Sequence, residues 1–172
     1  FAPIYHVYAP QGFDTNDDTQ VIVSGYLPNL CYKAPRAEVS VVGRTIFVTV
    51  KALLDDRVMF CPQMIVPFLE PVSVGVLTKG AYRVVVNGGS HYEQVSEISV
   101  TESVSPAVDN YVYANVNYIE QTPGSRKVVL KGYNPSDCFE FDRVEFISNG
   151  KDTYSTLPIM KQVKSECPVK MI

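Results

Sequence analysis

The segment Val23-Ser24-Gly25-Tyr26-Leu27-Pro28-Asn29-Leu30-Cys31 occurs twice in this chain, and this repetition is the main indication of its domain organisation. Its second copy is Leu130-Lys131-Gly132-Tyr133-Asn134-Pro135-Ser136-Asp137-Cys138, in which Gly, Tyr, Pro and Cys recur 107 residues later. Each copy is followed by a Cys-Pro pair, Cys61-Pro62 in the first and Cys167-Pro168 in the second. Self-similarity at a fixed offset is the signature of a duplicated module. We therefore expect two domains, a complete module at residues 1–107 and a partial copy at residues 108–172.

The four cysteines fall into two similarly spaced pairs, Cys31 with Cys61 and Cys138 with Cys167. None forms a C-x-x-C motif, and the chain has only two histidines, so a structural zinc site lacks well-spaced ligands. The spacing predicts one disulfide within each module, which places the protein in an oxidising compartment such as the periplasm, the cell surface or the medium. Four buried free thiols in a cytosolic protein are the alternative.

The composition indicates a globular chain and argues against nucleic-acid binding and a membrane-spanning helix. Hydrophobic residues make up 46% of the 172 residues, which is ordinary for a globular chain with a core. The formal net charge of −3 and the pI near 5.4 provide no basic surface for a phosphate backbone, so nucleic acid is not an expected partner. No apolar run approaches the roughly 20 residues that a membrane-spanning helix needs, so no membrane span is expected.

Short β-branched runs separated by turn residues predict strands throughout. The clearest hairpin joins residues 37–42 to residues 45–50 through Gly43-Arg44, and Ile46, Val48 and Val50 alternate with more polar residues. About seven such strands, with no convincing helix, predict an all-β fold of tandem immunoglobulin-like β-sandwich modules. The chain has no Trp, so the Cys…Trp…Cys core of antibody domains is not expected.

The second module is shorter than the first, because its sequence lacks an equivalent of residues 66–105. A sandwich without its C-terminal strands leaves an unpaired sheet edge and an uncovered apolar face. Three explanations are open: further residues of a longer chain, strand complementation by another chain, or packing of the half-module against the first module.

Two groups of residues are candidate binding sites. Asp14, Asn16 and Asp18 carry oxygen ligands at alternate positions and are a candidate calcium site, although Gly and Glu are missing where a helix-loop-helix calcium loop needs them. A solvated turn is the alternative, since the second copy lacks the acidic cluster. Tyr111, Tyr113 and Tyr118 lie near the junction of the modules and are a candidate contact surface.

No local motif indicates an enzyme. His6 and His91 lie outside any pattern that marks a nucleophilic site, and no Gly-rich phosphate loop follows a strand. We therefore expect a non-catalytic protein without a cofactor.

Three pieces of the chain resemble exported bacterial immunoglobulin-like domains of poorly defined role. They are the Gly-Tyr-x-Pro-x-x-Cys stretch, the Cys61-Pro62 piece with Val66-Pro67-Phe68, and the Gly80-x-Tyr82 strand that ends in Asn87-Gly88. The resemblance covers nearly all of the first copy and the front of the second. It implies a sandwich fold and an extracytoplasmic location, and it carries no catalytic residue.

The functional hypothesis is an exported binding or structural module that contacts protein or glycan at the cell envelope. The alternative is an inhibitor or accessory domain of a secreted hydrolase, which presents a loop such as Leu30 to Arg36 or Leu54 to Cys61 from a rigid sandwich.

Overall fold

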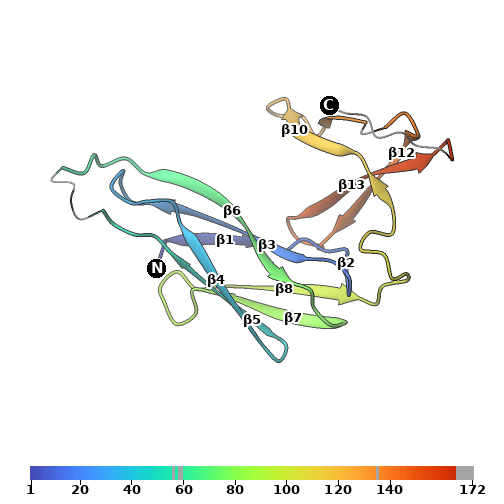
Figure 1. The fold of residues 1–172 in the computed structure, drawn as a ribbon. Helices are drawn as coiled ribbons and strands as arrows, with labels where there is room; N and C mark the ends of the chain where they lie inside the picture. The colour runs from blue at the N-terminus through green and yellow to red at the C-terminus, as the bar shows by residue number, and fades with distance from the viewer. Residues whose placement is uncertain (56, 58–59, 135, 166–172) are drawn as a thin grey trace. The chain divides into compact units, whose positions relative to one another are not determined.

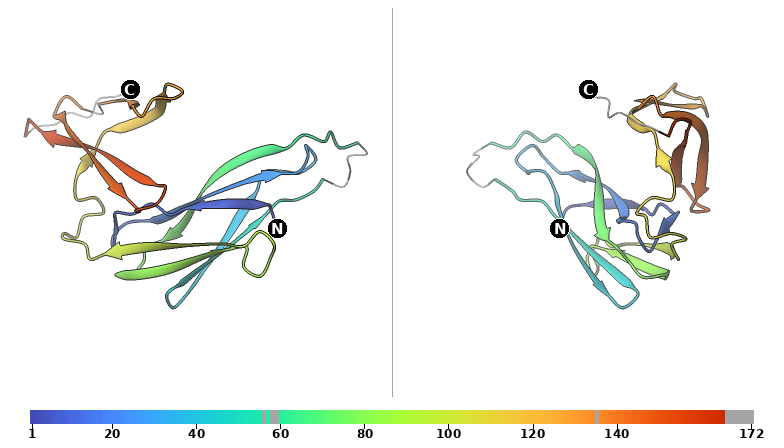
Figure 2. Two further views of the ribbon diagram at one scale, coloured as in Figure 1. Left: turned by 180° about the vertical axis from the view of Figure 1, so that it is seen from behind. Right: turned by 45° about the vertical axis from the view of Figure 1, so that its right-hand side comes forward.

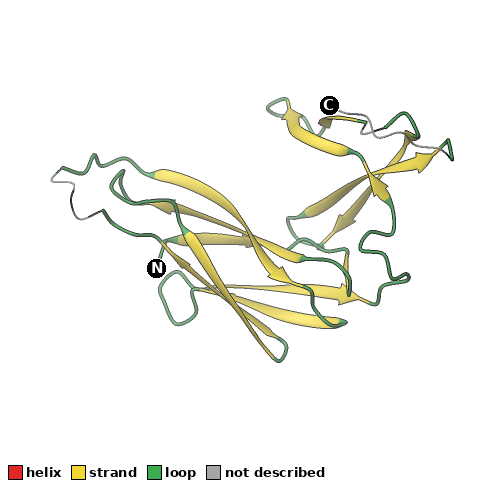
Figure 3. Ribbon diagram, viewed as in Figure 1, coloured by secondary structure: helices red, strands yellow, loops and turns green. Residues whose placement is uncertain are grey.

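The computed structural model describes residues 1–55, 57, 60–134 and 136–165. This part of the chain consists of strands, turns and loops without a helix (Figure 3). β-Branched runs such as Val84-Val85-Val86 fit a pleated surface better than a helix, where their side chains are restricted. The prediction of an all-β chain is confirmed. None of the described residues form a helix long and apolar enough to cross a membrane.

The chain divides into two compact units. Unit 1 comprises Phe1–Val108 with Ile147–Tyr154, and unit 2 comprises Asp109–Phe146 with Ser155–Ile172. The strands are β1 (Ile4–Tyr8), β2 (Phe13–Asp14), β3 (Thr19–Leu27), β4 (Arg36–Val42), β5 (Thr45–Lys51), β6 (Val66–Gly75), β7 (Gly80–Val86), β8 (Gln94–Thr101), β9 (Val112–Tyr113), β10 (Asn115–Gln121), β11 (Val128–Tyr133), β12 (Phe139–Ser148) and β13 (Tyr154–Gln162).

Unit 1 contains two sheets. One has the strand order β1-β3-β6 and is antiparallel, and the other has the order β2-β8-β7-β5-β4. Figure 1 and the rear view in Figure 2 show the two sheets as separate layers. The predicted hairpin is confirmed, since β4 and β5 pair from Arg36↔Lys51 to Val42↔Thr45.

The core of unit 1 lies between these layers. In β5, Ile46, Val48 and Val50 are buried, whereas Phe47 on the opposite face is exposed, as the alternation of the sequence predicts. Strands β1, β3, β6, β7 and β8 contribute further aliphatic side chains to the same cluster. The core is thus built from the alternate residues that the sequence marks as apolar.

Two features of unit 1 differ from the expectation. Strand β5 pairs with β7 in parallel, from Thr45↔Arg83 to Val48↔Val86, whereas both sheets of the immunoglobulin plan are antiparallel. Strand β2 also pairs with β8 in parallel, from Phe13↔Val100 to Asp14↔Thr101. In the other sheet, Pro67 and Pro71 do not interrupt β6 because β6 is an edge strand, where a missing N–H faces away from the ladder.

Tyr82 connects β7 to the loop that precedes it. Its side chain is buried, and its hydroxyl donates to the Thr78 carbonyl oxygen at 2.8 Å and lies 2.9 Å from Thr78 Oγ1. The Arg44 guanidinium stacks over its ring, 4.8 Å from the centroid. Such a bond to the backbone a few residues upstream is the tyrosine corner of sandwich domains.

Asn87 has a structural role that its sequence does not reveal. It follows β7 with a φ of 50°, as expected for a turn residue, but its side chain is fully buried. Its Oδ1 accepts from Val50 N–H at 2.8 Å, and its Nδ2 donates to the Ala2 carbonyl oxygen at 2.9 Å. Asn87 therefore joins β5 to the segment before β1.

Unit 2 contains the sheet β10-β11 and the sheet β12-β13-β9. Strands β12 and β13 are neighbours in the second of these sheets, and a turn around Asn149-Gly150 joins them. Unit 2 has few buried apolar side chains among its described residues, namely Cys138, Pro158, Ile159 and Met160.

The repeated segment has the same local geometry in each unit. Gly25 pairs with Ile4 and Gly132 pairs with Val116, and a register shift directly follows each partner. A Cβ on Gly25 would meet the Pro3 carbonyl oxygen, and one on Gly132 would meet that of Asn115. The repeat therefore needs glycine at this position because the neighbouring backbone leaves no room for a side chain.

The turn before each cysteine is also alike. Asn29 Oδ1 accepts from Cys31 N–H at 3.0 Å, and Ser136 Oγ accepts from Cys138 N–H at 3.2 Å. Both residues lie two positions before their cysteine. Short polar side chains at this position are typical of turns that bond their own backbone two residues on.

Candidate protein-contact site at the linked loops

The β3–β4 loop, residues 28–35, and the β5–β6 loop, residues 52–65, are covalently joined. Cys31 and Cys61 form a disulfide with their Cα atoms 5.5 Å apart, which confirms the prediction for this pair. Asp56, Val58 and Met59 lie outside the described residues. We call the described parts of these two segments the linked loops, and Figure 1 shows them at the same end of unit 1.

Backbone hydrogen bonds reinforce the disulfide. Lys33 N–H donates to the Leu53 carbonyl oxygen at 2.8 Å, and Asp55 N–H donates to the Cys31 carbonyl oxygen at 2.9 Å. Tyr32 and Leu54 form an antiparallel bridge between these bonds. The two loops therefore behave as one short ribbon rather than as independent segments.

The linked loops expose a group of apolar side chains. Each of the following is at least 49% exposed: Leu30, Leu53, Leu54, Phe60, Met64 and Ile65. Phe60 is the most exposed of them, at 78%. A single exposed apolar residue is normal on a protein surface, but a group gathered on one structural element is typical of an interaction site.

Charged side chains stand beside this apolar group. Asp55 forms ion pairs with Lys33 at 3.2 Å and with Arg57 at 3.0 Å. Hydrogen bonds from Arg57 and then from Lys33 lower the pKa of Asp55 to about 2. The carboxylate is therefore ionised at neutral pH, and the linked loops carry charged as well as apolar side chains, as protein interfaces do.

Residues of the candidate calcium site mainly form hydrogen bonds within unit 1. Asp14 Oδ1 accepts from Asn16 N–H at 2.8 Å, and Asn16 Nδ2 donates to the Ser105 carbonyl oxygen at 2.8 Å.

Asp18 accepts from Ser73 Oγ at 2.7 Å and from Gly75 N–H at 3.0 Å, and the Ser73 bond is the main cause of the lowered pKa of Asp18. The structure thus brings Asp14 and Asn16 together in one turn and directs Asp18 to β6. Among the described residues, no group of three acidic, His or Cys side chains is arranged for a metal. Calcium binding stays a prediction.

The three candidate tyrosines belong to different parts of unit 2. Tyr111 lies before β9 with its ring under the Arg143 guanidinium, 5.3 Å from the centroid. Tyr113 lies in β9 opposite Ile159, and Tyr118 lies in the other sheet, on β10, opposite Lys131. Tyr111 and Tyr118 are exposed, whereas Tyr113 is partly buried. Their role as a contact surface stays a prediction.

Cys138 is disulfide-bonded, and Cys167, its predicted partner, lies outside the described residues.

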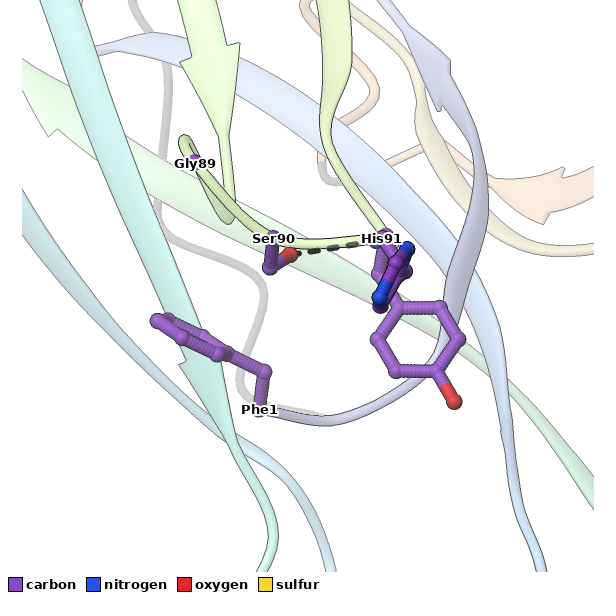
Figure 4. A pocket seen from close by; sticks show the side chains of 5 residues that line it. Phe1, Gly89, Ser90 and His91 are labelled. Atoms are coloured by element: carbon purple, nitrogen blue, oxygen red, sulfur yellow. Dashed lines mark hydrogen bonds between the residues drawn. The ribbon is translucent and has the colours of Figure 1, made fainter.

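An open depression of about 400 Å³ lies between Phe1 and the β7–β8 loop, lined by Gly89, Ser90, His91 and Tyr92. Figure 4 shows the Phe1 ring across from Ser90 and His91. Ser90 Oγ donates to the Asn87 carbonyl oxygen at 2.7 Å and accepts from Tyr92 N–H at 3.1 Å. Ser90 therefore stabilises the turn, and these bonds do not prepare it as a nucleophile.

Sequence reasoning identified both linked loops but not their apolar character. The signal was present in Leu53-Leu54 and Met64-Ile65, apolar pairs that do not alternate with polar residues as a half-buried strand does. Apolar residues in turn-rich segments indicate an exposed contact loop, whereas a core strand is indicated by a β-branched or alternating apolar run.

Comparison with known proteins supports the sandwich assignment. A family model described as the ORF11 beta-sandwich domain matches residues 21–98, which extend from β3 into β8. Over these residues, the chain is similar to that domain. The match includes both linked loops and the Cys31–Cys61 disulfide. No curated protein and no solved structure matches the chain.

Proposed function

We propose that this chain is a non-catalytic, exported module that binds another protein at the cell envelope through the linked loops. The observation that carries the proposal is the group of six exposed apolar side chains on loops joined by the Cys31–Cys61 disulfide. Leaving such side chains in water costs free energy that binding recovers, at about 25 cal/mol per Å² of apolar surface buried. A stable disulfide also supports export, since cytosolic thiols are kept reduced.

The chemistry of the linked loops favours a protein partner over a glycan. Five of the six exposed apolar side chains are aliphatic or Met, and only Phe60 is aromatic. Hydroxyl-rich ligands need precisely placed polar groups, because each buried hydroxyl must be hydrogen-bonded. The apolar surface of the linked loops instead suits an apolar groove or patch on another protein.

Inhibition of a secreted hydrolase is the second candidate function. The disulfide and the hydrogen bonds between their described residues restrict the linked loops before binding. Such preorganisation lowers the entropy cost of association, and rigid loops of this kind suit insertion into an active-site cleft.

We also propose that the two units are tandem copies of an immunoglobulin-like module. The pairing of Gly25 and Gly132 with equivalent bulged partners supports duplication. The Tyr82 corner supports the immunoglobulin-like assignment, and the parallel β5–β7 pair would make it a variant of that plan.

The test is capture of a binding protein from envelope extract by the tagged chain. Leu53→Asp and Phe60→Asp place a charge in the apolar group, and we expect each to reduce capture at least tenfold, by roughly 1.4 kcal/mol or more. Val76→Asp and Val104→Asp are matched controls, because both valines are well exposed elsewhere in unit 1. Equal capture by all four variants would show that the linked loops are not the site.

The same preparation distinguishes the two candidate functions from an enzyme. Inhibition of a hydrolase in the extract that is lost in Phe60→Asp would favour the inhibitor. Turnover of a substrate panel by the purified chain itself would contradict both candidates.

A further inference from the structure

The open depression beside the β7–β8 loop has a fixed wall at Phe1. Ala2, the next residue, is bonded on both sides of its backbone. Its N–H donates to the Val50 carbonyl oxygen at 2.8 Å, and its carbonyl oxygen accepts from Asn87 Nδ2 at 2.9 Å. These bonds hold the Phe1 side chain beside the loop, where it lines the depression (Figure 4).

Hydrogen bonds also fix the loop that forms the other wall. Ser90 Oγ donates to the Asn87 carbonyl oxygen and accepts from Tyr92 N–H. Glu93 N–H donates to the Ser90 carbonyl oxygen at 3.2 Å, and Glu93 Oε2 accepts from Gly89 N–H at 2.6 Å. A loop held in this way presents its side chains in one arrangement before a ligand arrives, which lowers the entropy cost of binding.

Three of the residues that line the depression carry rings, namely Phe1, His91 and Tyr92. All three are exposed, Phe1 at 64% and Tyr92 at 36%. The His91 ring and the Tyr92 hydroxyl form no hydrogen bond with another described residue. The depression therefore combines apolar ring surfaces with polar groups that a ligand can use.

This combination of groups matches a sugar ring. The faces of a pyranose carry C–H groups, which contact the negative face of an aromatic ring favourably. Its hydroxyls need hydrogen-bond partners, and the Tyr92 hydroxyl and the His91 ring nitrogens can donate or accept. The volume of about 400 Å³ lies within the roughly 300–1,000 Å³ of small-molecule sites, and the open side leaves the rest of a glycan in solvent.

Two other classes of ligand suit the depression less well. The Glu93 carboxylate at the loop and the net charge of −3 disfavour a ligand that carries phosphate. An organic cation is attracted to aromatic rings, but this attraction is weak where the cation stays hydrated, as it does in an open depression.

We infer that Phe1, His91 and Tyr92 bind one pyranose ring of a neutral glycan. The rings of Phe1 and Tyr92 contact the C–H faces of the sugar. The His91 ring nitrogens and the Tyr92 hydroxyl bond to the hydroxyls at its edge. This glycan site goes beyond the proposed function, because it uses none of the linked loops.

The probes are three neutral oligosaccharides, cellotetraose, maltotetraose and chitotetraose, each added to the intact chain. Amide NMR spectra follow binding at each residue. At least one probe should shift the signals of Gly89, Ser90, His91 and Tyr92 in a saturable way, with a Kd of roughly 1 mM or below. Sorbitol has the hydroxyls without the ring and is the matched ligand control, for which we expect no saturable shift.

Variants test which side chains hold the sugar. Tyr92→Ala should weaken binding about tenfold or more, because it removes a contact face and a hydroxyl. Tyr92→Phe keeps the ring and should weaken binding less than Tyr92→Ala does. Phe47→Ala is the matched control, since Phe47 is an aromatic residue of β5 that is 42% exposed and does not line the depression. This control and Phe60→Asp in the linked loops should both bind the sugar as the unchanged chain does.

Several results would overturn the inference. They include the absence of a saturable shift with all three oligosaccharides up to roughly 10 mM, an equal shift with sorbitol, and equal affinity of Tyr92→Ala and the unchanged chain. Tighter binding of choline than of any oligosaccharide would assign the rings to an organic cation. Protein capture from envelope extract that falls in Tyr92→Ala as it does in Phe60→Asp would assign the depression to the protein-contact site instead.

Discussion

Replacing Asn87 with Ala should destabilise unit 1 far more than a turn substitution normally does. Two buried hydrogen bonds are lost, from Val50 N–H at 2.8 Å and to the Ala2 carbonyl oxygen at 2.9 Å. Each buried group left without a partner costs about 1–3 kcal/mol. Ala also tolerates the positive φ of 50° less well than Asn, at a cost of about 1 kcal/mol. Together these costs give an expected loss of about 3–7 kcal/mol, a large part of the roughly 5–15 kcal/mol that stabilises a domain.

Urea unfolding followed through the amide signals of β7 measures this loss for unit 1 alone. We expect a lower midpoint with an unchanged slope, because the surface exposed on unfolding stays the same. Asn87→Gly separates the two causes: it loses both hydrogen bonds but relieves the backbone, so it should be about 1 kcal/mol more stable than Asn87→Ala. Lys79→Ala is the exposed control in the same unit and should change stability by less than about 0.5 kcal/mol. A loss below about 1 kcal/mol for Asn87→Ala would refute the bridging role.

Three further predictions concern the disulfide, the repeat glycines and pH. The double variant Cys31→Ser with Cys61→Ser should lose about 3–4 kcal/mol in urea unfolding, because the disulfide closes a loop with a sequence separation of 30; an unchanged midpoint would contradict this. Gly25→Ala and Gly132→Ala should each destabilise their own unit by about 1–3 kcal/mol, since the new methyl group meets a backbone carbonyl oxygen. Amide hydrogen exchange should therefore become faster only in the unit that carries the substitution. Faster exchange in both units of either variant would contradict the division into two units. The folded-state pKa of Asp55 is below its ordinary value of 3.8, so its stabilising effect is present above pH 4 and lost as the pH falls through about 2. Carboxyl NMR titration measures that pKa directly, and a value of 3.8 or higher would exclude the ion pairs.

Most of the strand pattern follows from local sequence. In β5, alternation of apolar and polar residues fixes which side chains are buried, and the Gly43-Arg44 turn fixes its pairing with β4. The pairing of Cys31 with Cys61 follows from the repeated spacing of the cysteines. These features depend on neighbours along the chain or on a repeat, both of which are visible in one sequence.

Long-range pairing does not follow in the same way. The parallel contact between β5 and β7 joins segments separated by another strand, and nothing in Thr45–Lys51 specifies its direction. The side chain of Asn87 reaches Ala2 across 85 residues, although its local sequence indicates only a turn. The continuity of β6 was also not predicted, because prolines suggest a break unless the strand is known to lie at an edge.

The candidate site was predicted in part. The two loops were identified because the spacing of the cysteines links them. The exposure of Phe60 and Leu53 could not be predicted, since it depends on which other described residues pack over these side chains. Burial is a tertiary property, so an apolar residue in a turn-rich loop gives no direct sign of whether it is covered.

The covalent connection of the two loops is the basis of the proposed contact surface, and peptide mapping tests it most directly. The unfolded, unreduced protein is alkylated, digested and analysed by mass spectrometry. We predict a cross-linked peptide that contains Cys31 and Cys61 and separates into two peptides on reduction. Recovery of both cysteines as alkylated thiols without reductant would contradict the linked loops and the exported location proposed from them.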